Sequence, residues 1–392
     1  MAGKRLIDQV EQIIEGDVEA EKLRSQLAAV RRNYKAALVA IERERQRANS
    51  LASLADVGGA RLRKRRRKHT ADSATAIVLL SDWHVEERVP GESIGWKNHF
   101  DLSIADQRLA ELSERIATLV SHERRLARID RIVIAALGDF ISNIIHEDTA
   151  ELAQLAPLAA TRWAGERLRS IIDLAAGLAD EVIVVTAVGN HGRSVMKPRI
   201  GTEHEHSFEQ NLYLMMAAAE KHENVFWQVG EGYLNVVDLD GYKVACHHGH
   251  GITGNIHVGA SRAIAQWQRS TPVDLHVFGH HHQFSWCRGK YVSNGSLIGY
   301  NAYALRNRLE FEPPCQSLVV VSHERHECTR AIPIFCDRDL QEAGKCQSRQ
   351  SRVATSSTST KRTRSSAKSS NRGRKVRIRP PSTLTSKKSR RT

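Results

Sequence analysis

Three short apolar runs and the residues that follow them decide the fold: A-I-V-L-L-S-D-W-H at 76–84, I-V-I-A-A-L-G-D at 132–139 and V-I-V-V-T-A-V-G-N-H at 182–191. Each run has the length of a buried strand and ends in Asp, Gly, Asn or His residues. The intervening segments, 102–127 and 150–178, have the apolar spacing of helices. Strands that alternate with helices predict an α/β fold with buried strands.

The second half of the chain is richer in strands. Helices are expected at 208–222 and 258–268. Further strands are expected at 225–229, 233–239, 242–246, 273–278, 291–293, 317–321 and 331–335. This order predicts layered sheets flanked by helices.

Metal-ligand side chains follow the strands in five clusters. They are Asp82 with His84, Gly138-Asp139, Gly189-Asn190-His191, His247 to His250, and Gly279 to His282. In an open α/β sheet, residues beyond the carboxyl ends of strands converge on one crevice. Carboxylates, imidazoles and an amide oxygen together suit first-row divalent metals, and their number suits two ions better than one. A single histidine near a strand end is usually structural, but five such clusters in order predict a metal site.

The ordered series D-x-H, G-D, G-N-H, H and G-H-x-H resembles the calcineurin-like metallophosphoesterase superfamily. The resemblance spans about residues 77–282 and is closest to phage-encoded members described as SbcD-like DNA repair exonucleases. It implies a four-layer α-β-β-α sandwich over 74–342 and a dinuclear site. The expected cofactors are two divalent metal ions, manganese first, with iron, zinc or magnesium as alternatives.

The resemblance also implies a role for each site residue. The first metal would be held by Asp82, His84 and His282, Asp139 would bridge, and the second would be held by Asn190, His248 and His280. His247 and His250 are alternatives to His248, and His281 should point away from the site. His191 would contact the phosphate or the leaving group.

Two positions depart from the pattern of the superfamily. The acid that usually follows G-N-H, and often orients the histidine, is replaced by Gly192. The run after Gly138-Asp139 has Asn143 where phosphoprotein phosphatases have a second Asp. Arg193 is a candidate phosphate ligand, because guanidinium binds phosphate oxygens in pairs, although it could equally be a surface residue.

The net charge of +14 is divided unevenly along the chain. Residues 1–68 carry +8, residues 69–342 carry −10, and residues 343–392 carry +16 with no acid. The run R-L-R-K-R-R-R-K at 61–68 lies in a basic linker, 58–73, and the tail 343–392 has the composition of a disordered segment. Both basic segments are expected to contact nucleic-acid phosphates, although the tail could instead be a solubilising extension.

The segment 1–57 is expected to be helical. Its apolar residues follow alternating steps of four and three, as in a coiled coil: Leu23, Leu27, Val30, Tyr34, Ala37 and Ile41. This helix would either join copies of the chain into an oligomer or pack on the main domain. No apolar run reaches membrane-spanning length, no secretory signal is evident, and the six cysteines form no C-x-x-C pair. A cytoplasmic protein without membrane contact is expected, in the host cytoplasm if phage-encoded.

The leading hypothesis is a metal-dependent phosphoesterase that hydrolyses phosphodiester bonds of nucleic acid by metal-activated water. One alternative is a phosphatase or phosphodiesterase acting on nucleotides or phosphoproteins. The other is a nucleic-acid-binding protein whose metal site is vestigial.

Overall fold

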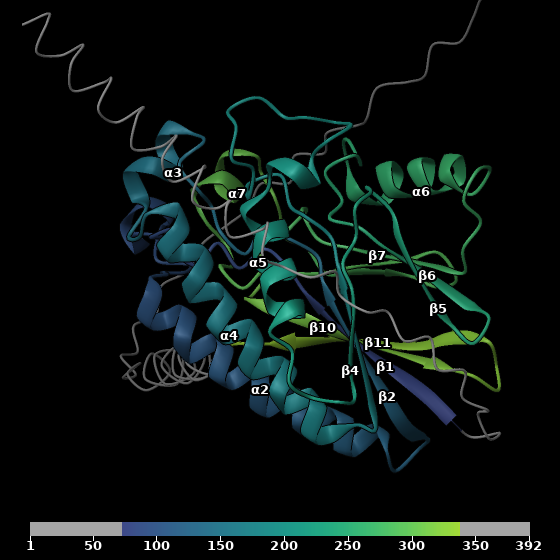
Figure 1. Ribbon diagram of the computed structural model, residues 1–392. Helices are drawn as coiled ribbons and strands as arrows, with labels where there is room; N and C mark the ends of the chain where they lie inside the picture. Colours follow the sequence, from purple (N-terminus) through teal and green to yellow (C-terminus); the bar gives the residue numbers. More distant parts are fainter. Residues whose placement is uncertain (1–72, 338–392) are drawn as a thin grey trace, which may run out of the picture. The chain divides into compact units, whose positions relative to one another are not determined.

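A computed structural model describes residues 73–337 of the chain (Figure 1). The expected N-terminal coiled coil, the basic run 61–68 and the tail 343–392 lie outside these residues.

The described part contains two β-sheets. The first has six strands in the order β11 (Glu327–Phe335), β10 (Cys315–Ser322), β1 (Ser73–Leu80), β2 (Arg128–Ala136), β3 (Glu181–Thr186), β4 (Val225–Gln228). Within it β1 to β4 are parallel, and β10 and β11 are antiparallel additions. The second has five strands in the order β5 (Asn235–Leu239), β6 (Tyr242–Cys246), β7 (Leu275–Phe278), β9 (Tyr291–Ser293), β8 (Ser285–Cys287).

Alternation along the central strands places one set of side chains on each face. In β1, Ala76, Val78 and Leu80 pack toward the helices, while Ile77 and Leu79 pack toward the second sheet. Because both faces are buried, the strand is apolar throughout, as expected for a parallel sheet between two layers.

Helices cover the outer face of each sheet. The first sheet packs against α2 (Leu102–Glu123), α4 (Pro157–Leu178) and α5 (Phe208–Ala218). The second packs against α6 (Ile256–Trp267), whose Ile256, Ala260 and Ile264 contact Phe278 and Tyr291. The described residues therefore form the α-β-β-α layers that the sequence predicted. The shorter elements are η1 (Gly91–Ile94), α3 (Glu147–Leu152), η2 (His204–His206) and α7 (Ala302–Arg306).

The prediction of a single helix over 150–178 is wrong. The chain forms α3 and α4 instead, separated by residues 153–156. Pro157 is the first residue of α4, where its missing N–H costs nothing, and a proline disfavours helical geometry in the residue before it. Gln154 N also donates to Glu86 O at 2.8 Å, so the break pairs with the loop after β1.

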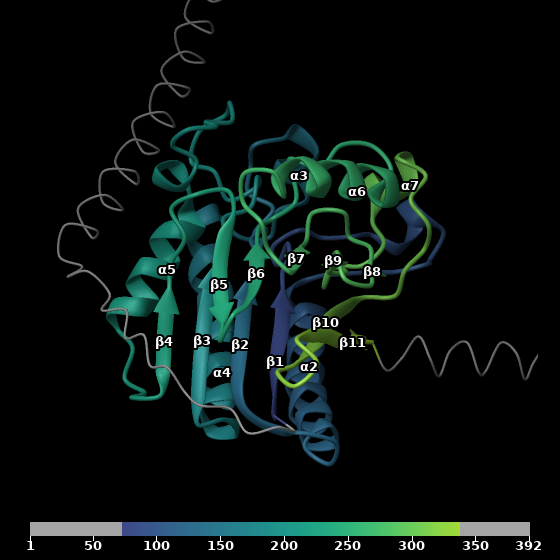
Figure 2. The same cartoon turned by 90° about the vertical axis from the view of Figure 1, so that its right-hand side faces the viewer.

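The parallel strands all point toward one edge of the first sheet (Figure 2). The segments that follow β1, β2 and β3 therefore start at the same edge. No helix among residues 73–337 is long and apolar enough to cross a membrane.

Candidate metal centre

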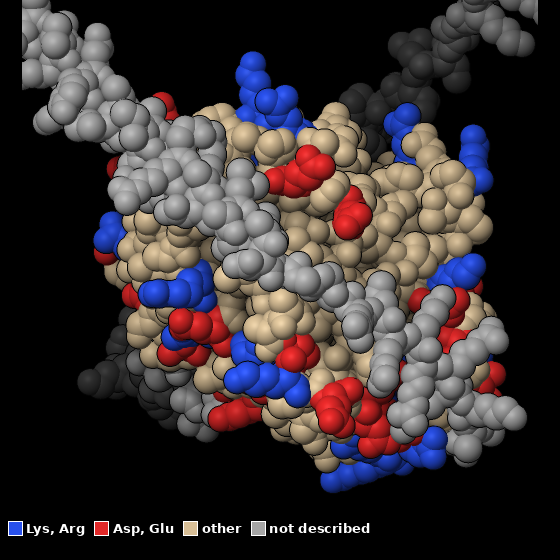
Figure 3. Space-filling model, viewed as in Figure 1, with Lys and Arg blue, Asp and Glu red and all other residues tan. Residues whose placement is uncertain are grey.

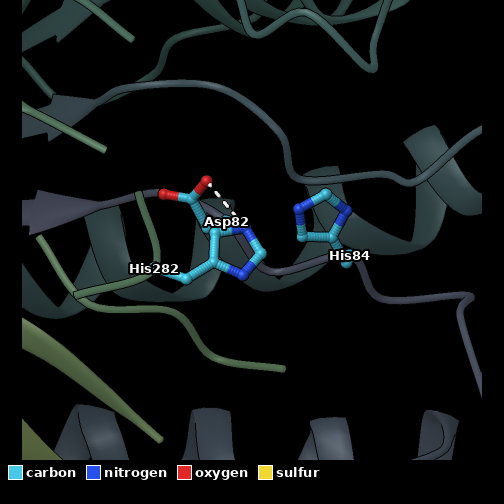
Figure 4. A group of neighbouring side chains, drawn as sticks. All are labelled: Asp82, His84 and His282. Carbon is cyan, nitrogen blue, oxygen red and sulfur yellow. Dashed lines mark ion pairs between the residues drawn. The ribbon is translucent and has the colours of Figure 1, made fainter. Parts of the chain in front are cut away.

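The structure brings the predicted ligands into two groups. In each group, one ligand atom from every residue lies within 4.8 Å of the others. The first group is Asp82, His84 and His282 (Figure 4), and the second is Asp139, His248 and His280. Their members follow β1, β2, β6 and β7, so both sheets contribute.

Asp82 is fixed by neighbours on every side of its carboxylate. His282 Nε2 lies 3.3 Å from Oδ1, Ser81 Oγ donates to Oδ2 at 2.5 Å, and the backbone N of His280 donates to both oxygens at 3.0 Å. Burial alone would raise the pKa of Asp82, but the hydrogen bond and charge of His282, with the charge of His248, outweigh it and lower the pKa. The residue is therefore held as a carboxylate, the form that binds metal.

The tautomer of His84 follows from its hydrogen bonds. Its Nδ1 lies 2.9 Å from Ser142 Oγ, and that hydroxyl donates to Glu87 Oε2 at 2.7 Å. Because the hydroxyl has one proton and gives it to Glu87, Nδ1 of His84 must donate. Nε2 is then a bare lone pair, and it is buried without a hydrogen-bond partner among the described residues. Burial, followed by the charges of His191 and His282, lowers the pKa of His84 to about 3. A neutral imidazole with an unsatisfied lone pair is what a divalent cation requires.

The second group is organised around His248. Its Nδ1 donates to Leu137 O at 2.8 Å, which turns Nε2 toward Asp139 Oδ2 at 2.9 Å and Asn190 Oδ1 at 3.1 Å. Burial lowers the pKa of His248, but the charge of Asp139 outweighs it and raises the pKa to about 10. Burial would likewise raise the pKa of Asp139, yet the charges of His248 and His191 bring it well below its usual value. A negative potential that stabilises an imidazolium here also stabilises a divalent cation.

Asp139 accepts a second contact, from the backbone N of His191 to Oδ1 at 2.7 Å. Its carboxylate is grouped with the second set of ligands alone. A bridging role for Asp139 stays a prediction.

The backbone is left-handed at five of these residues. The φ angles are 54° at Asp82, 47° at His84, 53° at Asp139, 69° at His280 and 54° at His282. Residues other than glycine rarely adopt this region of backbone conformation, and such strain clusters at functional sites. Five such residues within the two ligand groups indicate that ligand geometry outweighs local backbone preference here.

The glycines before the ligands allow close approach of the loops. A Cβ at Gly138 would lie 2.2 Å from the backbone N of Gly189, and one at Gly279 would lie 2.3 Å from Asp82 Oδ2. Both contacts are impossible for a real side chain, so the G-D and G-H pairs of the sequence are steric requirements of the site.

His191 lies beside the ligands without belonging to either group. Its Nδ1 donates to Ser142 O at 2.9 Å, and its ring meets His84 edge-on at 4.9 Å between centroids. Asn143 fixes the same loop, since its Nδ2 donates to the backbone O of His191 at 2.9 Å and of Arg193 at 2.7 Å. The contact of Nδ1 with Ser142 fixes the orientation of the His191 ring.

Arg193 is committed mainly to the backbone. Its Nη1 donates to Asn190 O, and its Nε donates to Met196 O at 3.3 Å. Its predicted contact with phosphate stays a prediction.

The remaining histidines of the two clusters belong to neither ligand group. His247 is buried against Trp267, His276 and Phe278, and His250 pairs with Glu203 at 3.1 Å. His281 belongs to neither ligand group, and its ring packs against Phe278.

Sequence reasoning missed Glu209, at the start of α5. This fully buried side chain accepts from Phe140 N at 2.7 Å and from Gly189 N at 2.8 Å, and so links the loops after β2 and β3. A Cβ at Gly192 would lie 2.8 Å from its carboxyl group. Burial and the charge of Asp139 raise the pKa of Glu209 to about 8. The only sequence signal was an acid in the first turn of a helix, which is common.

Two layered sheets that carry two groups of possible metal ligands are consistent with a metallophosphoesterase domain. The calcineurin-like phosphoesterase family model matches residues 75–284, more than half of the chain, and the chain belongs to this family. The likeness to phage SbcD-like exonucleases has no support beyond the motifs. No curated protein sequence matches the chain.

Several solved structures are similar to parts of the chain. A Vps29 single mutant from Entamoeba histolytica is 15% identical, with a TM-score of 0.28, and the match covers 66% of this chain and 98% of that one. A conserved protein from Streptococcus pneumoniae, described as a predicted phosphoesterase, is 14% identical, with a TM-score of 0.28 over 67% and 98%. The sulfate thiohydrolase SoxB of Thermus thermophilus, in complex with glycerol, is 10% identical, with a TM-score of 0.30 over 70% and 59%.

Proposed function

We propose that this protein is a metal-dependent nuclease that hydrolyses phosphodiester bonds of nucleic acid. The observation that carries the proposal is the pair of ligand groups with His191 beside them. The donor set of carboxylate, imidazole and amide oxygen fits two first-row divalent cations, with manganese as our first choice. Asp82, His84 and His282 would hold one cation, and Asp139, Asn190, His248 and His280 the other.

The cations would neutralise the charge of the phosphodiester and give a water nucleophile near neutral pH. The residues of the chain then have separate tasks. The Ser142 hydroxyl keeps the lone pair of His84 on its metal-facing side, and the Leu137 carbonyl does the same for His248.

We assign His191 the role of the general acid, because its ring lies beside that of His84 in the first ligand group. In the reaction, the oxygen of a water that has lost a proton to solvent would form the new bond to phosphorus, and the bond to the leaving oxygen would break. Nε2–H of His191 would give its proton to that leaving oxygen, and the imidazole would regain a proton from solvent. The carbonyl of Ser142 accepts from Nδ1 and fixes the direction of that proton.

Nucleic acid is supported as the substrate by the charge of the two ends. The basic segments 61–68 and 343–392 suit a polyanion, whereas the acidic middle, 69–342, does not attract one by itself. Small phosphoesters would gain nothing from these segments.

The test is a cleavage assay with manganese on labelled single- and double-stranded DNA and RNA. We expect cleavage by the full chain, none by Asp82→Ala, and none by His191→Ala, which should still bind its metals. Hydrolysis of p-nitrophenyl phosphate or cyclic nucleotides without any cleavage of nucleic acid would replace the proposal by a small-phosphoester enzyme. Bound manganese without hydrolysis of any ester would indicate a binding protein.

A further inference from the structure

The loop between β3 and α5 includes His191, beside the ligand groups, and carries an exposed tip on an anchored base. Arg193 and Ser207 form a β-bridge, Ser194 N donates to His206 O at 2.6 Å, and Phe208 N donates to Gly192 O at 2.8 Å. These backbone contacts close the base of the loop immediately after His191.

Side chains anchor the loop at two further points. Arg193 Nε donates to Met196 O at 3.3 Å, which fixes the start of the tip. On the return side, Glu203 pairs with His250 at 3.1 Å, and the His250 ring lies 5.6 Å from His248 and 6.3 Å from His280. The return side of the loop therefore lies close to the second ligand group.

The tip itself, M-K-P-R-I at 196–200, is exposed throughout. Ile200 is 97% exposed and Met196 is 62% exposed, so the tip projects from the surface. Lys197 and Arg199 form no ion pair with any residue in the described range 73–337, unlike many arginines of this domain. In Figure 3, Lys and Arg side chains stand out at the top edge, where Figure 1 places this loop.

Two unpaired cations on an anchored projection beside a phosphodiester site have a specific use. Residues 69–342 are acidic overall, so a polyanion needs local positive charge to approach this domain, and Lys197 and Arg199 supply two such charges. A small ester held by the two ligand groups would not extend to the tip. A polymer would, because its neighbouring phosphates continue away from the site.

We propose that the tip 196–200 is a strand-binding loop, in which Lys197 and Arg199 bind phosphates flanking the scissile bond of a nucleic-acid strand. This inference rests on the proposed nuclease function. It gives the domain its own contact with the polymer, separate from the basic segments at the ends of the chain.

The experiment compares two double variants of the full chain. Lys197→Gln with Arg199→Gln removes the two tip cations. Arg125→Gln with Lys221→Gln removes two exposed cations from the α2–β2 and α5–β4 turns, at the opposite edge of the first sheet. The substrates are a labelled single-stranded oligonucleotide and the small diester bis(p-nitrophenyl) phosphate.

We expect the tip variant to raise KM for the oligonucleotide by about tenfold. Its affinity should also depend less on salt, with the magnitude of the slope of log affinity against log salt smaller by about 1 to 2. Its hydrolysis of the small diester, its manganese content and its melting temperature should match the wild type. The control variant should retain the wild-type KM and salt slope.

The outcomes separate the two proposals. A wild-type chain that hydrolyses the small diester but no nucleic acid would refute the nuclease function. Wild-type KM and salt slope in the tip variant, with nucleic acid cleaved normally, would refute the strand-binding loop alone. Equal losses on both substrates would show that the loop supports the metal centre and would also overturn the inference.

Discussion

The side chain of Glu209 fills the space beside Gly192. The carboxylate from α5 occupies the space into which a side chain at position 192 would point. Gly192 has no left-handed φ, so sterics and not backbone conformation exclude a side chain there. The acid that the sequence pattern lacks after His191 is thus matched by a carboxylate from elsewhere in the chain.

This arrangement predicts a compensating pair of substitutions. Glu209→Ala leaves Phe140 N and Gly189 N buried without acceptors, which should destabilise the fold by roughly 1–3 kcal/mol for each group. Gly192→Asp alone should also be destabilising, because it crowds Glu209. The double variant should recover part of both losses, as measured by chemical denaturation and manganese titration.

If the losses of stability and manganese affinity in the double variant were the sum of those in the single variants, the two side chains would not be interchangeable in this space. Gly192→Ala is a matched control, since it crowds Glu209 and offers no carboxylate. It should not rescue Glu209→Ala.

Ser142 is a second residue whose role is testable. Its hydroxyl fixes the His84 tautomer through a chain that ends at Glu87. Ser142→Ala should weaken binding at the first metal position about 10–100-fold, the usual effect of losing a group that orients a metal ligand. Ser142→Thr keeps the hydroxyl and should retain most of the affinity in a metal titration followed by calorimetry. Unchanged affinity in Ser142→Ala would mean that His84 needs no orienting partner.

At the scale of elements, most strands and helices could be predicted, including the three-residue β9, but β8 and α7 could not. Runs such as 132–137 are buried on both faces, and that signal is strong in the sequence. β8 and α7 have three and five residues, which is too few for a periodic pattern, and short elements of this kind are found in some places, as at β9, and missed in others. The break before Pro157 was missed because the apolar spacing continues across it.

The site was predictable to the same extent as the strands that carry it. Every predicted ligand lies in a loop after a buried strand, so strand order alone placed it. The choice among His247, His248 and His250 needed coordinates, because a histidine run gives no direction to its side chains. Glu209 needed them as well, since its partners are backbone groups about 20 and 69 residues away.

The packing of α6 on the second sheet predicts a pH dependence. His276 is buried beside His247 and stacks on Trp267 at 5.8 Å, and neither of its ring nitrogens has a hydrogen-bond partner among the described residues. Burial lowers its pKa to about 4. Since an unfolded histidine has a pKa near 6.5, the unfolded state binds more protons between these values.

Stability should therefore fall as pH decreases from 6.5 to 4, with up to about 3 kcal/mol from this residue. His276→Gln should flatten that part of the curve in urea denaturation measured from pH 4 to 7. If this variant kept the wild-type slope of stability against pH, the pKa of His276 would be the same in the folded and unfolded states. His122→Gln is a suitable control, because His122 is exposed.

At the scale of the whole molecule, the metal centre joins the two sheets. Asp82, His84 and Asp139 come from the first sheet, whereas His248, His280 and His282 come from the second. Cations bound by both sets of ligands would cross-link the layers as well as serve catalysis.

Metal binding should consequently stabilise the fold. Manganese at 100 times its dissociation constant should add about 2.7 kcal/mol for each independent site. We expect the melting temperature to rise with manganese, to fall with a chelator, and to be independent of both in Asp82→Asn with Asp139→Asn. A melting temperature that ignores manganese in the wild type would argue against resident cations.

The left-handed backbone of the five ligands has a consequence for the descendants of such a protein. At each of these positions glycine would relieve conformational strain while abolishing a ligand. A lineage released from selection for hydrolysis should drift toward glycine at Asp82, His84, Asp139, His280 and His282, and gain thermal robustness as it does so.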